Sequence, residues 1–247
     1  MSDMNRGRVR VEWSGKRVRA VLGGEVVLDT TRPLLVWEGP HYPTYYVRVE
    51  DVRAELIPSG HLDHSPSRGD GEVHDLRSGR ITATGAARVM RESPIPELAG
   101  TVRVAWDAMD DWFEEDEPVY THARDPYTRV DILASSRRVR VAVDGVTVAE
   151  SCSPRILFET HLPPRYYLPI TDIRMDLLRP SETVTHCPYK GAATYWSLEI
   201  DDKRYEDLVW IYRTPLPESQ KIAGLACFYN EKVDLFVDDV EQERPTR

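Results

Sequence analysis

Polar and apolar residues alternate at the start of residues 17–22, which are followed by Gly23-Gly24 and then by the apolar run 26–28. A two-residue period is typical of a β-strand with one buried face. A glycine pair tolerates the positive φ angles of a tight turn between two such strands. The pattern therefore predicts a β-hairpin over residues 17–28.

Two further extended segments are expected at residues 34–37 and 52–57, on either side of a proline-rich loop that ends in a tyrosine pair. No longer stretch has the helical period of 3.6 residues, and only short turns are expected at residues 97–99 and 218–222. The segments between the turn formers therefore predict a mainly antiparallel β fold.

The same pattern occurs twice, at a constant spacing of 121 residues from Arg17 to Arg138, so that residues 17–58 align with residues 138–179 without a gap. The identical positions include turn formers, aromatics and acids: Gly24 and Gly145, Pro33 and Pro154, Glu38 and Glu159, Pro43 and Pro164, Tyr45-Tyr46 and Tyr166-Tyr167, and Asp51 and Asp172. Chance is a poor explanation for such a set. The chain is therefore expected to contain two related domains.

The alignment continues past this block, where residues 64–69 align with residues 186–191 at a spacing of 122. We expect a first domain over residues 8–122 and a second over residues 128–243, with a junction rich in acid and proline between them. A pseudo-twofold relation would let one chain mimic a homodimer of single-domain relatives. The protein itself is expected to be a monomer or a homodimer.

Composition narrows the classes of function. The chain has a net charge of −9, shared almost evenly between its halves, so no basic footprint for nucleic acid is expected. No apolar run approaches the ~20 residues that span a bilayer, and the N-terminus lacks the apolar segment of a signal peptide. These features predict a cytoplasmic protein without a membrane partner. All three cysteines lie in the second half, so reduced thiols are expected rather than a disulfide framework that supports both domains.

The central motif of the second half, Thr185-His186-Cys187-Pro188-Tyr189-Lys190-Gly191, resembles the bacterial family known as domain of unknown function 427. The resemblance also includes the segments 163–169, 172–173, 209–210 and 226–229, and it covers the second domain from end to end. The first domain looks like a diverged member that lacks the cysteine, the tyrosine and the lysine of the motif.

The resemblance implies a fold similar to the β-tent group, which includes the cereblon ligand-binding domain and methionine sulfoxide reductase B-type enzymes. The expected architecture is therefore mainly β, with two tandem antiparallel β-tent-like domains. The resemblance implies no activity. A nucleotidyltransferase label is attached to this family, but the chain lacks a Gly-Ser motif followed by a strand with paired carboxylates.

The candidate ligand-binding residues are an acid, a histidine, a cysteine, a lysine and four tyrosines of the second domain, with four counterparts in the first. They are Glu159, Tyr166, Tyr167, His186, Cys187, Tyr189, Lys190 and Tyr195, and Glu38, Tyr45, Tyr46 and His64. An aromatic pocket with a few polar groups is typical of a small-molecule site. The leading hypothesis is a small-ligand-binding module whose pocket lies in the second domain, while the first domain keeps a vestigial pocket or serves as a scaffold.

Each candidate has an alternative interpretation. Cys187 could be a nucleophile in an enzyme or a small buried hydrophobe, and Glu159 could bind a ligand, act as a base, or pair with loop N–H groups or an arginine. His186 and Cys187 are adjacent on a strand, so they should point to opposite faces rather than form a dyad. Of each tyrosine pair, one should pack inward and one face outward. A protein-interaction scaffold without a pocket is a third hypothesis.

Metals and cofactors are not expected. Many β-tent proteins hold zinc with two Cys-x-x-Cys motifs, and the chain has neither. His61, His64 and His74 could ligate a metal, but their segment is polar and rich in turn formers, so it is expected to be a solvated loop.

Overall fold

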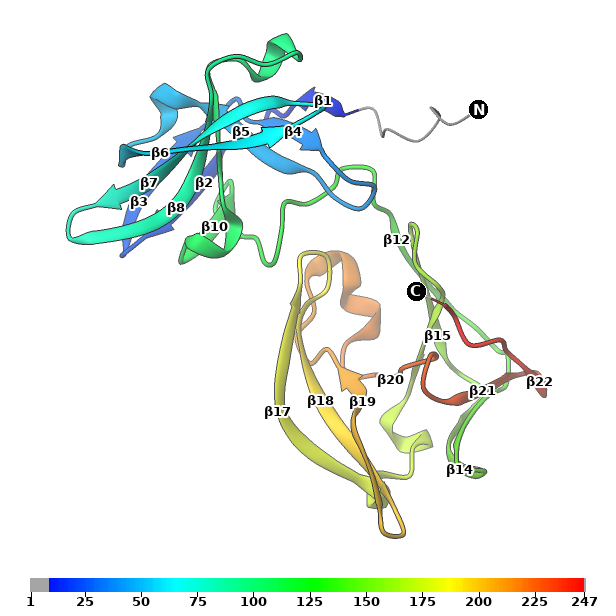
Figure 1. Ribbon diagram of the computed structural model, residues 1–247. Coiled ribbons are helices and arrows are strands. Elements are labelled where there is room, and N and C mark those ends of the chain that lie inside the picture. The colour runs from blue at the N-terminus through cyan, green and yellow to red at the C-terminus, as the bar shows by residue number, and fades with distance from the viewer. Residues whose placement is uncertain (1–8, 247) are drawn as a thin grey trace. The chain divides into compact units, whose positions relative to one another are not determined.

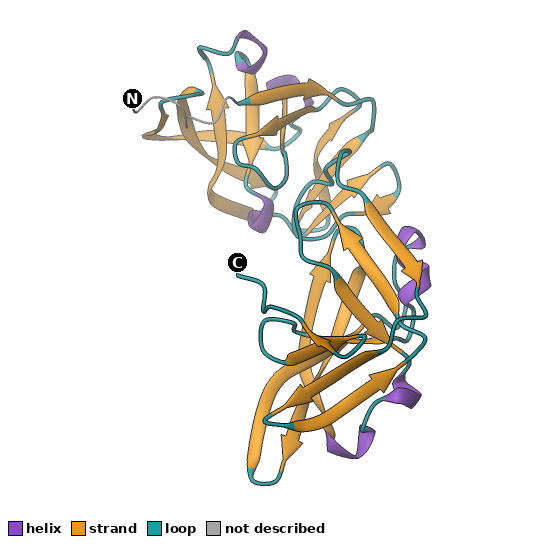
Figure 2. Ribbon diagram, turned by 90° about the vertical axis from the view of Figure 1, so that its right-hand side faces the viewer, coloured by secondary structure: helices purple, strands orange, loops and turns teal. Residues whose placement is uncertain are grey.

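The computed structural model describes residues 9–246, and the chain divides into two compact units, with the boundary between Asp125 and Pro126. Strands dominate both units, and the helices are short 3₁₀ turns (Figure 2). The mainly antiparallel β fold in two tandem domains is therefore confirmed. The pseudo-twofold relation concerns how the units are placed and stays a prediction.

The first unit contains a seven-stranded and a four-stranded antiparallel sheet (Figure 1). In sheet order, the seven strands are β1 (Arg10–Trp13), β4 (Leu34–Trp37), β5 (Thr44–Arg48), β9 (Thr101–Val104), β8 (Ile81–Met90), β7 (Gly69–Ser78) and β6 (Glu55–Ser65). The four strands are β11 (Glu117–Pro118), β10 (Asp111–Glu114), β2 (Val18–Leu22) and β3 (Glu25–Thr30).

The second unit repeats this topology strand for strand. Its seven-stranded sheet runs β12 (Val130–Ala134), β15 (Arg155–Glu159), β16 (Arg165–Leu168), β20 (Ala226–Phe228), β19 (Lys203–Ile211), β18 (Gly191–Ile200) and β17 (Leu178–Cys187). Its four-stranded sheet runs β14 (Val146–Ser151), β13 (Val139–Val143), β21 (Asp234–Val237) and β22 (Val240–Glu241). The duplication seen in the sequence is thus a duplication of two whole sheets.

The short 3₁₀ turns connect strands. They are η1 (Val49–Asp51), η2 (Pro96–Leu98) and η3 (Trp106–Ala108) in the first unit, and η4 (Ile170–Asp172), η5 (Met175–Leu177) and η6 (Pro217–Ile222) in the second. The turns expected near residues 97–99 and 218–222 correspond to η2 and η6. No helix among the described residues is long and apolar enough to cross a membrane.

An inner core lies between the two sheets of each unit. In the second unit it joins Val139 and Val141 of β13 with Leu198 of β18 and Phe228 of β20, all at most 2% exposed. Full burial of such a side chain stabilises the fold by roughly 1.5–3 kcal/mol. The alternation that predicted the hairpins arises because every second residue of β2 and β13 enters this core.

An outer cluster covers the opposite face of the seven-stranded sheet. In the second unit it includes Tyr167, Tyr195, Trp210, Tyr212 and Cys227, and none of these is more than 7% exposed. The sheet is therefore buried on both faces, and the outer face is rich in aromatic side chains.

The outer clusters also explain the tyrosine pairs. Tyr45 belongs to the inner core and Tyr46 to the outer cluster of the first unit, and both are buried. Tyr166 packs against the inner core, whereas Tyr167 lies in the outer cluster. The two members of each pair face opposite sides as expected, but the expectation that one faces solvent is wrong for Tyr45 and Tyr46 because both faces are covered.

The histidine-rich segment is not a solvated loop. His61 and His64 lie on β6 and His74 lies on β7, so the segment forms a hairpin at the edge of the sheet. His61 and His64 are exposed, while His74 is 3% exposed and its Nδ1 lies 2.9 Å from the backbone oxygen of Glu72. Polar residues can occupy this strand because one side of the hairpin borders solvent. No group of three metal-binding side chains occurs among residues 9–246.

Candidate functional site

A buried ion pair lies at the outer face of the second unit. Glu159 is the last residue of β15, and Lys190 lies in the turn between β17 and β18. Lys190 Nζ lies 2.5 Å from Glu159 Oε2, and the side chains are only 11% and 8% exposed. The structure therefore brings together two candidates that are 31 residues apart in the sequence.

The turn that carries Lys190 is fixed by its backbone. Gly191, which follows the lysine, has a φ of +92°, a conformation that favours glycine. The backbone oxygen of Lys190 accepts a hydrogen bond from Leu216 N at 3.1 Å, and that of Tyr189 accepts one from Ser219 Oγ at 3.0 Å. These bonds attach the turn to η6 and to Leu216, the residue before it. The fold therefore sets where the backbone of Lys190 lies.

The ion pair is not saturated with hydrogen bonds. An ammonium group has three donors, yet among the described residues Lys190 Nζ donates only to Glu159 Oε2. Within the same range, Glu159 Oε1 has no hydrogen-bond partner. A buried cation and a neighbouring carboxylate thus keep free capacity to donate and to accept.

Aromatic residues of the outer cluster share the face to which Glu159 belongs. Trp210 Nε1 donates to the Tyr167 hydroxyl at 3.2 Å, and the Tyr195 hydroxyl lies 2.9 Å from Thr185 Oγ1 and 3.3 Å from the Tyr229 hydroxyl. Burial raises the pKa values of Tyr167 and Tyr212, and the charge of Glu159 contributes to both shifts. These tyrosines therefore stay neutral near pH 7 and act as hydrogen-bonding groups.

His186 and Cys187 point to opposite faces of β17. Cys187 is paired with Gly191, and Thr185, two residues earlier, reaches Tyr195 of the outer cluster, so Cys187 shares that outer face. Cys187 also contributes to the raised pKa of Tyr212. His186 is exposed on the other face. Of the predicted residues in the second unit, Glu159, Tyr167, Cys187, Lys190 and Tyr195 share one face, whereas His186 and Tyr166 do not. Tyr189 is buried in the turn between β17 and β18.

The first unit contains a matching acid–cation pair. The pairing of Ser65 with Gly69 corresponds to that of Cys187 with Gly191, so Arg68 occupies the place of Lys190. Arg68 Nη2 lies 3.1 Å from Glu38 Oε2. The pair of opposite charges is therefore common to both domains.

Glu38 is more heavily bonded than Glu159. Its Oε1 accepts a hydrogen bond from the Tyr46 hydroxyl at 2.8 Å, and Arg103 Nη1 lies 3.2 Å from its Oε2. Arg68 Nη1 also donates to the Tyr46 hydroxyl at 2.8 Å. Burial, followed by the charge of Glu38, raises the pKa of Tyr46 to about 12. Both oxygens of this carboxylate are thus occupied by protein groups.

Tyr45 and His64 lie apart from Glu38. The Tyr45 hydroxyl donates to Glu114, whose other oxygen lies 2.6 Å from Lys16 Nζ. His64 Nδ1 lies 2.5 Å from Asp70 Oδ1 in an exposed pair. Of the four candidates in the first domain, only Glu38 and Tyr46 meet.

Sequence reasoning did not single out Arg68 or Arg103. Arg68 aligns with Lys190 at the spacing of 122 residues, so shared positive charge was an available signal. Arg103 had no such signal, because its counterpart by strand pairing is the neutral Cys227: Tyr46 pairs with Arg103 and Tyr167 pairs with Cys227.

The fold and these contacts define a tandem antiparallel β protein in which each domain carries an acid–cation pair on the outer face of its larger sheet. The chain belongs to the family described as Domain of unknown function (DUF427), whose model matches residues 10–115 and 131–239. The two matched segments confirm a two-copy member of that family. A search of curated proteins gave no match.

Proposed function

We propose that the second domain binds a small molecule that offers a hydrogen-bond acceptor and a neighbouring N–H donor, such as an amide, a lactam or a cyclic imide. The acceptor would bond to Lys190 Nζ, and the N–H group would donate to Glu159 Oε1. The observation that carries this proposal is the unused hydrogen-bonding capacity of a nearly buried ion pair.

Physical chemistry supports a role other than stability for this pair. Burying two charges costs several kcal/mol per ion in desolvation, and their attraction offsets this cost only when the remaining donors and acceptors are satisfied. The protein leaves two ammonium donors and one carboxylate oxygen without partners among the described residues. A few polar groups with aromatic neighbours are typical of small-molecule binding sites.

The first domain has a different role in this proposal. The Tyr46 hydroxyl and the Arg103 guanidinium already bond to Glu38. A ligand would have to displace those groups, at the cost of the bonds that they make. The first domain therefore serves as a scaffold with respect to this ligand class, and Glu38 provides a matched control.

The test is a thermal-shift screen of the full chain against small amides, lactams and cyclic imides. We expect at least one compound to raise the melting temperature of the wild type and of Glu38→Gln, but not that of Glu159→Gln. Cys187→Ala should keep the response, because binding does not require the thiol. Calorimetry on the best compound should show at least a tenfold loss of affinity in Glu159→Gln.

A stability control is needed because Glu159→Gln leaves Lys190 without a counter-charge, which costs about 3–5 kcal/mol for a buried pair. The double variant Glu159→Gln/Lys190→Met removes both charges and should recover most of that loss. It should still fail to bind the compound. Binding that survives in the double variant, or a screen without a single response, contradicts the proposal.

A further inference from the structure

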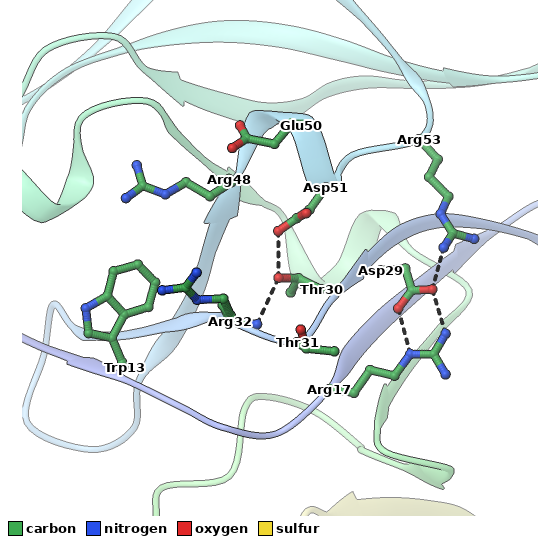
Figure 3. A pocket seen from close by; sticks show the side chains of 10 residues that line it. All are labelled: Trp13, Arg17, Asp29, Thr30, Thr31, Arg32, Arg48, Glu50, Asp51 and Arg53. Atoms are coloured by element: carbon green, nitrogen blue, oxygen red, sulfur yellow. Dashed lines mark hydrogen bonds and ion pairs between the residues drawn. The ribbon is translucent and has the colours of Figure 1, made fainter.

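A pocket lies entirely within the first domain, and Glu38 is not among its lining residues. Its volume is about 670 Å³. It is lined by the end of β1, the end of β3 with the residues after it, and the segment from β5 through η1: Trp13, Arg17, Asp29, Thr30, Thr31, Arg32, Arg48, Glu50, Asp51 and Arg53 (Figure 3). A cavity of this size matches the usual range for small-molecule sites.

An exposed tryptophan and two arginines lie at one end of this pocket. The Trp13 side chain is 50% exposed, which is unusual for the largest aromatic residue. The guanidinium carbons of Arg32 and Arg48 lie 5.9 and 5.7 Å from the centre of its ring. In Figure 3, the guanidinium group of Arg32 lies beside the Trp13 ring and that of Arg48 lies above it.

These two arginines have no acidic partner among residues 9–246. At the other end of the pocket, Arg17 and Arg53 lie 2.6 and 2.5 Å from Asp29 Oδ2, so that carboxylate is already neutralised. Arg48 Nη1 donates instead to the backbone oxygen of Ala99 at 3.1 Å. Arg32 and Arg48 therefore keep guanidinium donors for another group.

The nearby acidic residues do not pair with the guanidinium groups of Arg32 and Arg48. Asp51 Oδ2 accepts the Thr30 hydroxyl at 2.7 Å, and Thr30 Oγ1 in turn accepts Arg32 N at 3.1 Å. Glu50 is exposed and forms no ion pair among the described residues. In Figure 3, dashed lines join Asp51 to Thr30 and Asp29 to its arginines, but none reaches the guanidinium groups of Arg32 and Arg48.

Comparison with the second domain shows that the fold does not require Trp13, Arg32 or Arg48. At the spacing of 121 residues, Trp13, Arg32 and Arg48 correspond to Ala134, Ser153 and Pro169. The strand registers agree, because Trp13 pairs with Leu34 as Ala134 pairs with Arg155. Three other residues that line the pocket are the same in both domains: Arg17, Asp51 and Arg53 correspond to Arg138, Asp172 and Arg174.

We infer that this pocket binds a small aromatic molecule that carries a carboxylate or phosphate group. The anionic group would bond to the guanidinium groups of Arg32 and Arg48, which match the planar geometry of such anions. The ring would stack against the exposed face of Trp13. This inference is independent of the proposed function, since it concerns other residues in the other domain.

The experiment is a calorimetric titration of the full chain with phenyl phosphate and with benzoate, at low ionic strength. We expect at least one of the two to bind, with phenol and inorganic phosphate each at least tenfold weaker. The two aromatic anions distinguish a phosphate ligand from a carboxylate ligand. Arg32→Ser and Trp13→Ala, which introduce the residues of the second domain, should each weaken binding at least tenfold.

Two controls separate the site from general charge effects. Arg80→Ser removes one exposed arginine outside the pocket and should leave the affinity unchanged. Glu159→Gln should also leave it unchanged, so failure of the proposed function cannot be confused with failure here. The inference is overturned if neither aromatic anion binds, if Arg32→Ser binds as well as Arg80→Ser, or if inorganic phosphate binds as tightly as phenyl phosphate.

Discussion

At the residue scale, one position changes what the shared acid–cation pair can do. Arg103 lies beside Glu38 and gives that carboxylate a second cation, whereas the equivalent place beside Tyr167 holds Cys227. Cys227 is fully buried, and burial raises the pKa of its thiol. A neutral thiol neither neutralises Glu159 nor donates a strong hydrogen bond to it. Among the described residues, Glu159 therefore has Lys190 as its one cationic partner, whereas Glu38 has two.

The three thiols allow the binding hypothesis to be separated from the enzyme hypothesis. Cys152 is exposed, Cys187 is half-buried and Cys227 is buried. If the second domain only binds its ligand, a thiol reagent at pH 7.5 should label Cys152 first, Cys187 more slowly and Cys227 only on unfolding. Mass spectrometry of a labelling time course gives the three rates.

The opposite order of rates would favour catalysis. A nucleophilic cysteine is held as a thiolate and labels fast even when it is partly covered. Faster labelling of Cys187 than of Cys152 in the wild type would therefore contradict the purely binding function. Lys190→Met serves as the control, because loss of that nearby cation should slow Cys187 only if the cation stabilises a thiolate.

Some of these residues could be predicted from the sequence and others could not. Glu38 and Glu159 stood out because the same acid ends the same strand in both copies. Arg68 did not stand out because it is not identical to Lys190, although an arginine and a lysine can each pair with a carboxylate. That His186 and Cys187 face opposite sides followed from strand alternation, but the face on which Cys187 lies needed the contacts of β17.

At the element scale, the turn between β6 and β7, and likewise the turn between β17 and β18, decides where the cation lies. Gly69 and Gly191 occupy the same place in the two copies, with φ of +87° and +92°. A side chain at such a φ costs about 1–2 kcal/mol. These glycines therefore hold Arg68 and Lys190 against their acids.

Alanine at these two glycines should destabilise the domains unequally. Gly191→Ala meets only ordinary contacts at 3.6 Å or more, so it should cost about the backbone strain alone, roughly 1–2 kcal/mol. Gly69→Ala would place its Cβ 2.9 Å from Pro94 Cδ, so it should cost more. Thermal denaturation of the full chain should show both losses as lower melting temperatures.

Gly15→Ala is the control for these variants. Gly15 has no positive φ, and a Cβ at this position would have nothing within 4 Å. The melting temperature of Gly15→Ala should stay close to that of the wild type. A larger loss in Gly191→Ala than in Gly69→Ala would contradict the contact argument.

The elements differ in how far the sequence predicts them. The hairpins of β2 with β3 and β13 with β14 were visible because their alternation matches one buried face. The hairpin of β6 with β7 was hidden because most of β6 is exposed, so its residues lack an apolar period. Bulges in β6, β7 and β8 also shift the alternation within those strands, which a fixed two-residue period cannot follow.

At the scale of the whole molecule, duplication would allow the two proposed sites to coexist in one chain. Both copies keep the sheets and the acid–cation pair, so each copy can change elsewhere without loss of the fold. The first copy has Trp13 and two unpaired arginines where the second has alanine, serine and proline. The second has Cys227 where the first has Arg103. The sequence predicted the duplication, while the different contacts of Glu38 and Glu159 required the structure.

Each domain should fold and bind by itself. Every sheet and every apolar cluster among the described residues is built from one side of the boundary between Asp125 and Pro126. Residues 9–125 and 126–246, produced separately, should therefore show β-type circular dichroism and cooperative thermal unfolding. The first half should retain the affinity of the full chain for the aromatic anion, and the second half should retain the response to the amide or imide. If either half is unfolded, or if each ligand needs both halves, the independence of the two sites is contradicted, because a site contained in one folded domain cannot depend on residues of the other.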